Sequence, residues 1–312
     1  MKRFSWFLAA LLLPSAAAAA NVPITSCETT VNAGDTGILQ ADLDCSSSTY
    51  GVRMLVGTTL DLNGHTISGG AGTFATVLGV NRTQGGLRLG RGAGPAIGSG
   101  AGEFTIEGPG GISGFRPAPL NSNVPACVLI NGGHVHITGG TGRVDIAGCA
   151  VGLLGSSGFI SNKGRTELEM VDLHDGGFGA AVKTLTASDV TAHHTVGGVA
   201  LSVLGKAHVS NVSVHDNFGN ALTSGQSMDG SGVVATNNTV TGVLTRGTMR
   251  LSNVTATGNQ TGVFARLVVL TDSTLTGNGS DIGSLRRPQL TNVACDHSTR
   301  RDGSPWGVCA DD

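Results

Sequence analysis

The chain has 312 residues, of which 50 are glycine and 13% are charged, and its formal net charge is −2. A chain with such a small charge excess is neither typically disordered nor surrounded by a strong electric field, so we expect no nucleic-acid partner. Its many Gly, Val, Thr, Ser and Asn residues are typical of a turn-rich all-β protein.

Residues 1–20 have the pattern of a secretory signal peptide. Lys2 and Arg3 give a positive start, residues 4–14 form an apolar run, and residues 16–20 offer a small-residue cleavage site. A membrane anchor is less favoured, because the apolar run is shorter than the roughly 18–20 residues that cross a bilayer. We therefore expect a mature chain that is soluble, monomeric, periplasmic or extracellular, and not inserted in a membrane after signal removal.

The six cysteines are even in number and fall into three local pairs. Several connectivities are possible for six cysteines, but their locality and the export signal favour disulfides within the pairs. A thiolate metal site is less favoured, because the chain has no Cys-x-x-Cys pair. The predicted bridges are Cys27–Cys45, Cys127–Cys149 and Cys295–Cys309.

Residues 21–57 are predicted to cap the start of a solenoid, because an open end exposes unpaired backbone groups and core side chains. Residues 58–69 then read Thr-Thr-Leu-Asp-Leu-Asn-Gly-His-Thr-Ile-Ser-Gly, and residues 104–108 and 111–115 read Phe-Thr-Ile-Glu-Gly and Gly-Ile-Ser-Gly-Phe. These stretches resemble successive rungs in right-handed parallel β-helix proteins of the pectin-lyase-like superfamily. The resemblance implies this architecture for the mature chain but no particular activity, since the scaffold carries lyases, hydrolases, epimerases and binding proteins.

Two insertions interrupt these rungs. Residues 70–102 are glycine-rich and contain Arg82, Arg88 and Arg91, and residues 116–126 form the second insertion. A phosphate-binding glycine loop is less favoured, because it needs a following helix and none is readable. We interpret both segments as irregular loops that leave the coils and border a binding groove.

The clearest pattern is a repeat of about 20 residues across residues 171–283. Its copies begin at Val171, Val190, Val212, Val234, Val254 and Ser273. Such a period without helix formers is typical of a solenoid, and the local alternation of apolar and polar residues indicates strands. We predict an all-β fold, a single right-handed parallel β-helix of about ten coils at residues 58–284, with disulfide-stapled ends and a C-terminal cap at residues 285–312.

The repeat places ionisable side chains in two columns. Three residues after each start lie His174, His193, His215, Asn237, Thr257 and Thr276, and four residues after each start lie Asp175, His194, Asp216, Asn238, Gly258 and Gly277. Strand parity points the histidines outward, and adjacent coils lie roughly 4.8 Å apart, which predicts a ladder of crowded titratable groups. The candidate catalytic residues are His174, Asp175, His193, His194, His215 and Asp216. The alternative is structural, because turns favour Asp, Asn and His for backbone reasons.

A basic row is predicted beyond the turn that bears this ladder. Twelve residues after each start lie Lys183, Ser202, Ser224, Arg246, Arg266 and Leu285. We take Lys183, Arg246 and Arg266 as candidate substrate-binding residues, because Lys and Arg pair well with carboxylates. An acidic polysaccharide is preferred over a neutral one, because neutral sugars are usually held by aromatic side chains and the chain has few Tyr and Trp residues.

The chemistry expected of such a site is proton removal next to a carboxyl group. Residues 172–175 read Asp-Leu-His-Asp, which is similar to the Asp-Pro-His-Asp motif of mannuronan epimerases on this scaffold, with Leu in place of Pro. In this interpretation His193 or His215 is the base and Lys183 or Arg246 neutralises the carboxylate. The paired-Asp motifs of polygalacturonases and the Trp-x-Asp-His motif of pectate lyases are missing from the sequence.

The sequence therefore predicts a secreted protein that binds or acts on a uronate polysaccharide, as a lyase or epimerase if it is an enzyme. The alternative is a non-catalytic envelope or extracellular protein that binds a ligand or supports a structure. In that case the histidines could form a surface metal site, since His is the commonest metal ligand. The sequence alone identifies no cofactor.

Overall fold

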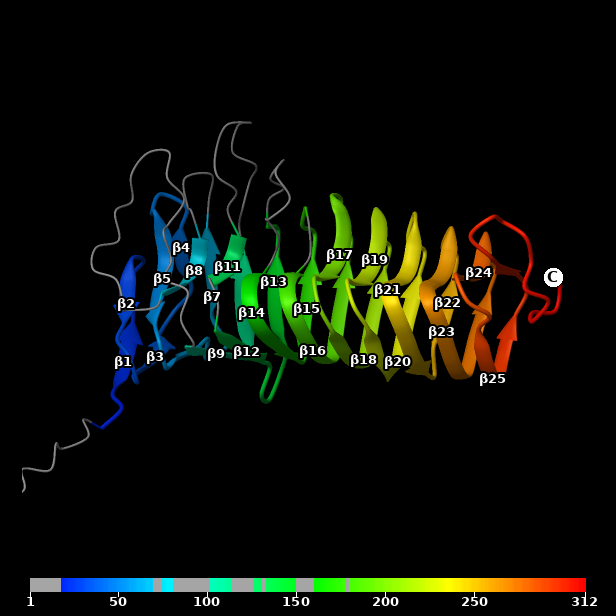
Figure 1. Cartoon of the computed structure of the whole chain (residues 1–312). Coiled ribbons are helices and arrows are strands. Elements are labelled where there is room, and N and C mark those ends of the chain that lie inside the picture. The colour runs from blue at the N-terminus through cyan, green and yellow to red at the C-terminus, as the bar shows by residue number, and fades with distance from the viewer. Residues whose placement is uncertain are drawn as a thin grey trace, which may run out of the picture.

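The computed structural model describes residues 18–69, 75–80, 102–113, 126–130, 133–149, 160–177 and 180–312. In these ranges all the regular structure is β-strand, and 26 strands join in one sheet whose paired strands run parallel. The strands stack as successive coils from the N-terminal to the C-terminal end (Figure 1). The predicted parallel β-solenoid is therefore confirmed, with about ten turns. None of the described residues belongs to a helix long and apolar enough to span a membrane.

Each turn contributes a strand segment to each of three faces, which we call the histidine face, the middle face and the return face. The histidine face contains β4 (Leu43–Cys45), β7 (Thr66–Gly69), β10 (Gly110–Ser113), β13 (Val144–Ala147), β15 (Val171–His174) and β22 (Thr255–Thr257). The middle face contains β2 (Thr29–Val31), β5 (Tyr50–Leu55), β8 (Ala75–Val80), β11 (Ala126–Ile130), β17 (Gly198–Val203), β19 (Gly219–Ser224), β24 (Ser280–Ser284) and β26 (Ser298–Thr299). The return face contains β1 (Asn21–Ile24), β3 (Thr36–Leu39), β6 (Thr58–Asp61), β9 (Glu103–Glu107) and β12 (His134–Thr138).

Seven longer strands bend from one face to the next. They are β14 (Ile160–Glu169), β16 (Ala180–His193), β18 (Ala207–His215), β20 (Met228–Thr236), β21 (Thr241–Ser252), β23 (Thr261–Thr276) and β25 (Gln289–Cys295). Strand β16 is an example: residues 180–182 pair with β17 on the middle face, whereas residues 185–188 and 190–193 pair with β18 on the return face and the histidine face. Strand pairing begins at Asn21 and extends to Thr299, so the predicted caps at residues 21–57 and 285–312 also contain paired strands.

The core is a set of apolar columns along the solenoid axis. One column consists of Leu173, Ala192, Val214, Ala235, Ala256 and Leu275, which are paired in register and fully buried. Each of these side chains is covered by the same position of the next turn. Full burial of a Val or Leu side chain contributes roughly 1.5–3 kcal/mol, so stacking of turns is the main source of stability.

Two corners of each turn require a left-handed backbone. After the histidine face this position is held by Asp175, His194, Asp216, Asn237, Gly258 and Gly277, with φ from 54° to 69°. Before the histidine face it is held by Met170, Asp189, Asn211, Gly232, Asn253, Asp272 and Asn292, with φ from 49° to 69°. Gly, Asn and Asp adopt this conformation at the lowest cost. The polar residues at these corners therefore have a backbone role in addition to any function.

The predicted register is wrong at the fourth repeat. Ala235 pairs with Val214 and Thr236 pairs with His215, so the copy begins at Val233 rather than Val234. Val233 is buried and Val234 is exposed. The two adjacent valines fit either register, and a shift of one residue exchanges the inward and outward faces. The histidine column consequently continues through Thr236, whereas Asn237 lies at the corner.

The predicted first loop is wrong in part. Ala75–Val80 forms β8, which pairs with β5 on one side and β11 on the other, so the coil continues through the segment expected to be irregular. Its residues include the β-branched Thr and Val that favour strands. The described ranges leave out residues 70–74 and 81–101 of that loop, which include Arg82, Arg88 and Arg91. They also leave out the second loop up to residue 125 and residues 1–17 of the expected signal peptide.

A buried column of polar side chains follows the corner after the histidine face. Its members are Thr195, Asn217, Asn238, Asn259 and Asn278, and they are 9% exposed or less. Asn238 was expected at the exposed corner, and the one-residue shift moves it into this column. Each of the first three asparagines donates from Nδ2 to the Oδ1 of the next at 2.9 Å. The column ends at the buried carboxylate of Asp281, which accepts from Asn278 Nδ2 at 2.8 Å.

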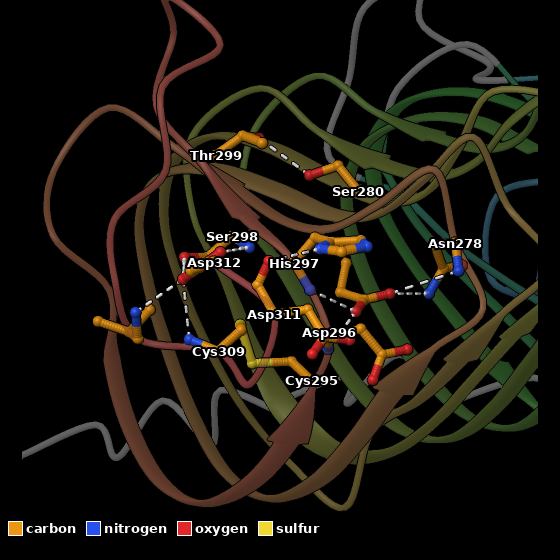
Figure 2. Close-up of a disulfide and its surroundings, with 12 residues drawn as sticks. Asn278, Ser280, Cys295, Asp296, His297, Ser298, Thr299, Cys309, Asp311 and Asp312 are labelled. Atoms are coloured by element: carbon orange, nitrogen blue, oxygen red, sulfur yellow. Dashed lines mark hydrogen bonds between the residues drawn. A yellow bond between two sulfur atoms is a disulfide. The ribbon is translucent and has the colours of Figure 1, made fainter.

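The three predicted disulfides are confirmed, with Cα–Cα distances of 5.6, 5.8 and 5.1 Å. Figure 2 shows the C-terminal bridge, Cys295–Cys309, beside the carboxylate of Asp312. That carboxylate accepts hydrogen bonds from the backbone amides of Val308 at 2.7 Å and Cys309 at 2.9 Å, and from Ser298. Burial acts to raise the pKa of Asp312, but these hydrogen bonds outweigh it and lower the pKa to about 2.

Candidate functional site

Three imidazoles form a parallel stack on the histidine face. His174 pairs in register with His193, and His193 pairs with His215. The ring centroids are 5.1 and 4.9 Å apart, with interplanar angles of 10° and 5°. The spacing follows from the rise of one turn, roughly 4.8 Å, so the fold alone holds the rings in contact. This is the ladder that the repeat predicted.

The stack is half-buried because its members cover one another. Each histidine follows a fully buried residue on its strand, so strand alternation points its ring out of the core. His193, the middle ring, is 19% exposed, whereas His194 at the corner is 55% exposed. The middle imidazole is therefore the least solvated member of the ladder.

The corner residues contact the ladder from one side. Asp175 Oδ2 lies 2.7 Å from His174 Nδ1, and Asp216 Oδ2 lies 2.8 Å from His215 Nδ1. On the turn between them the corner residue is His194, whose Nδ1 lies 3.0 Å from His193 Nδ1, with the two rings at 75°. The left-handed corner thus directs each side chain back toward its neighbour. A carboxylate accepts there on two turns and an imidazole stands in its place on the middle turn.

Two further carboxylates contact the ladder from the other side. His174 Nε2 lies 2.8 Å from Asp145 Oδ1, and His193 Nε2 lies 3.3 Å from Asp172 Oδ1. Asp145 and Asp172 are paired in register on β13 and β15. Neither residue was among the candidates predicted from the sequence, although Asp172 is the first residue of the Asp-Leu-His-Asp motif. Their outward position two residues before the ladder column was the signal that could have identified them.

These contacts push the pKa values of neighbouring histidines apart. Burial acts to lower the pKa of His174, but the hydrogen bond to Asp175 and the charges of Asp145 and Asp172 outweigh it, so its pKa is raised. Burial lowers the pKa of His193; the charge of Asp172 acts to raise it, but the neighbouring imidazoles lower it further. Two stacked rings thus differ in the direction in which their pKa moves.

The corner carboxylates are held in their charged form. The hydrogen bond from His174 lowers the pKa of Asp175, and burial opposes it only in part. The hydrogen bond from His215 likewise lowers the pKa of Asp216, with help from Asn237. The ladder is therefore a column of imidazoles between two lines of carboxylates, and its charge depends on imidazole protonation.

The ladder is not arranged as a metal site. Among the described residues, no group of three or more His, Cys, Asp or Glu side chains has an arrangement that could hold a metal ion. The parallel rings place their nitrogens side by side instead of directing them at one point. The Nδ1 atoms of the three stacked rings already face the corner residues.

The predicted basic row is interrupted. Register on the middle face aligns Val182, Val203, Ser224, Thr245, Ala265 and Ser284. The residues that follow these are Lys183, Leu204, Gly225, Arg246, Arg266 and Leu285. Ser224 is therefore buried rather than outward, and two turns separate Lys183 from Arg246. The corners vary in length between turns, which is why a fixed count of twelve residues failed.

The two columns of the histidine face are neutral on the three turns that follow His215. Thr236, Thr257 and Thr276 continue the histidine column, and Val234, Thr255 and Thr274 continue the column of Asp145 and Asp172. Among the described residues of the histidine column, imidazoles therefore occur only from His174 to His215. The ladder is a local site and not a property of every turn.

Ionisable pairs also occur elsewhere on the solenoid. On the return face His134 lies 3.6 Å from Glu103 and 3.2 Å from Glu167. His208, also on the return face, pairs with Asp229 at 2.5 Å. These pairs show that a His–carboxylate contact alone does not identify a site. What distinguishes the ladder is the stack of rings and the opposed pKa shifts.

An exposed apolar pair borders the ladder. Val196 and Phe218 lie two residues beyond the corner residues His194 and Asp216 and are 67% and 65% exposed. Neither side chain was predicted from the sequence, because strand alternation does not extend into a corner. Their position next to the ladder makes them part of its surroundings.

Fold and site together define a class, a disulfide-bonded parallel β-solenoid with a polar ladder on one face. Comparison with protein-family models, with curated proteins and with solved structures gives no match. A function can therefore be inferred only from the residues of the site.

Proposed function

We propose that the histidine face binds a uronate-containing polysaccharide and removes the proton next to its carboxyl group, as a lyase or an epimerase. The observation that supports this most is the unequal setting of two stacked rings. His174 is held between Asp145 and Asp175, at 2.8 and 2.7 Å, whereas His193 has one carboxylate at 3.3 Å and faces another imidazole. Pairs of groups with pKa values pushed apart are typical of acid–base catalysis.

The two rings would have different roles. His193, with its lowered pKa, is neutral near neutral pH and can accept the proton from the carbon next to the carboxylate. His174, with its raised pKa, holds a proton more readily than His193, and as an imidazolium it would neutralise the carboxylate as negative charge develops. In a lyase the electron pair forms a C=C bond while the glycosidic C–O bond breaks. In an epimerase a proton returns to the opposite side of the same carbon.

The remaining candidate residues would support these two. Asp172 orients His193 by accepting from its Nε2–H, so Nδ1, which faces His194, is the nitrogen that would accept the substrate proton once the substrate displaces that contact. His215 with Asp216 is the candidate proton donor on the next turn. Lys183, Arg246 and Arg266 lie at the far edge of the middle face, so they would contact only sugar residues that extend beyond the ladder.

A second function, binding without catalysis, has its own support. Most imidazoles and carboxylates of the ladder already contact one another, as His134 and His208 also contact carboxylates on the return face. In this case the protein would be a structural or ligand-binding component outside the cytoplasm. The three disulfides suggest an oxidising environment, and we propose the periplasm or the extracellular space for a monomeric, secreted chain.

The deciding experiment is incubation with a panel of uronate polymers, with and without calcium. Absorbance of unsaturated products reports a lyase, and solvent deuterium incorporated next to the carboxyl group reports an epimerase. His193→Ala should abolish either signal, and the matched control His208→Ala, on the return face, should not. Binding should strengthen as pH falls through the ordinary His range and weaken with salt. Binding by the wild type with neither signal would favour the non-catalytic function.

A further inference from the structure

The exposed apolar side chains of the solenoid are concentrated beside the ladder. Six large apolar side chains are exposed in the described ranges. Four of them lie on the histidine face or on the corner that follows it, namely Val196, Phe218, Val234 and Val240. The other two, Leu204 and Leu285, lie at the far edge of the middle face. This clustering separates the first group from apolar residues scattered singly over a surface.

Val196 and Phe218 occupy the same position of successive turns. The Val196 amide donates to Gly176 O at 2.9 Å, and the Phe218 amide donates to Thr195 O at 2.8 Å. The two side chains therefore stack roughly one turn apart, in step with His194 and Asp216. We call Val196 and Phe218 the apolar rim of the site.

The rim stands on a rigid part of the backbone. Between Asp216 and Phe218 lies Asn217, whose Nδ2 donates to Ala192 O at 3.1 Å and to the next asparagine of the buried column at 2.9 Å. After Phe218 comes Gly219 with φ 124°, where a Cβ would lie 2.0 Å from Gly198 O. The backbone on both sides of Phe218 is thus fixed, and the ring is presented to solvent without a role in the core.

We propose that Phe218, with Val196 beside it, binds the C–H face of one sugar ring of the polysaccharide and so positions that ring against the histidine ladder. This inference rests on the proposed function and adds a specificity residue to it. A uronate ring has an ionic edge and an apolar face, which match a charged column bordered by an exposed aromatic ring. A purely ionic ligand has no apolar face for Phe218, and a purely apolar ligand would have to desolvate the neighbouring carboxylates.

The test measures the Kd of wild type and Phe218→Ala for defined uronate oligosaccharides at low and high salt. We expect a loss of roughly five- to tenfold for Phe218→Ala with an unchanged salt dependence, because stacking is not screened by ions. Phe218→Trp should retain wild-type affinity. Leu204→Ala is the matched control, since Leu204 is equally open at 73% exposure but remote from the ladder, and its Kd should not change.

The outcomes separate this inference from the proposed function. If the wild type binds uronate oligosaccharides and Phe218→Ala binds them equally well, the rim has no such role and the proposed function stands. If the wild type binds only neutral oligosaccharides and Phe218→Ala loses that binding, the rim is a sugar site and the uronate proposal is wrong. If the wild type binds no oligosaccharide of either kind, both are wrong. A Phe218→Ala variant with unchanged thermal stability shows that the loss is not caused by misfolding.

Discussion

At the scale of single residues, the ladder is a set of groups that must differ in protonation. The Nδ1 atoms of His193 and His194 face each other at 3.0 Å, so one must carry a proton while the other accepts it. His174 faces carboxylates on both of its nitrogens, and for it the charged form is favoured. Histidine side chains on adjacent turns therefore favour different protonation states.

This difference predicts opposite pH dependence for two variants. The raised pKa of His174 gives stability that is fully present below the ordinary His pKa of 6.5 and is lost as pH rises through the higher folded value. The lowered pKa of His193 gives stability that is present above 6.5 and is lost as pH falls through the lower folded value. His174→Gln should therefore be relatively most destabilising on the acidic side, and His193→Gln on the basic side. Thermal melts of both variants across the His range would show this, and parallel pH profiles would contradict it.

The candidate residues could be predicted only where local alternation applies. His174, His193 and His215 follow from the parity of short strands of known spacing. Asp145 lies before the recognised repeat, on a strand whose pairing with β15 only the structure reveals. Phe218 lies in a corner, where no alternation defines inward and outward. Contacts between turns depend on register, and the variable corner lengths of this chain hide the register from a simple count.

At the scale of elements, the strands were easier to predict than their exact alignment. The period of about 20 residues and the alternation of apolar residues predicted the solenoid, and the positions of the cysteines predicted the disulfides. Strand β8 was not predicted, because the glycine-rich segment around it was interpreted as a loop. Val233 and Val234 left two registers open. The buried asparagine column resolves that choice, because Asn238 can join Asn217 and Asn259 only in the observed register.

The buried asparagine column predicts that removing a single side-chain amide will strongly destabilise the protein. Asn238 Nδ2 donates to Val214 O and to Asn259 Oδ1, and its own Oδ1 accepts from Asn217. Asn238→Ala leaves these buried groups without partners and should lower the free energy of unfolding by about 3 kcal/mol. Chemical denaturation measures the change.

A neighbouring residue provides the control for this variant. Asn237 is exposed and has a left-handed backbone, with φ 54°. Asn237→Gly should change the free energy of unfolding by no more than about 0.5 kcal/mol, because glycine adopts that conformation freely. Equal losses in the two variants would show that the column is no more important than the corner.

At the scale of the whole molecule, the solenoid depends on how its last turn is closed. Near the Cys295–Cys309 bridge, the Asp281 carboxylate ends the asparagine column, and the Asp312 carboxylate binds the amides of Val308 and Cys309. Figure 2 shows Asp312 beside Cys309. These two carboxylates thus accept hydrogen bonds from amides of the last turn and of the tail that follows it. Loss of the closure should loosen the end before the centre.

Asp312 gives this closure a defined pH range. Its folded pKa of about 2 is below the ordinary 3.8, so its contribution is present above 3.8 and is lost as pH falls through about 2. Asp312→Asn should therefore speed amide hydrogen exchange in β26 and around Cys309 at neutral pH, without changing exchange on the histidine face. If exchange in β26 and around Cys309 stays as slow in the variant as in the wild type, the disulfide alone is sufficient to hold the C-terminal end of the solenoid.

The repetition of turns also has a mechanical consequence. From His174 to Thr276 each turn takes 19 to 22 residues of chain but advances the solenoid by only roughly 4.8 Å. The same residues drawn out straight would span about 65–75 Å. Tension applied at the C-terminal end would meet first a turn cross-linked by Cys295–Cys309, and then turns that each share one asparagine link with the next. The molecule would lengthen in nearly equal steps, one turn at a time, and the histidine ladder would come apart only after the asparagine-linked turns on its C-terminal side.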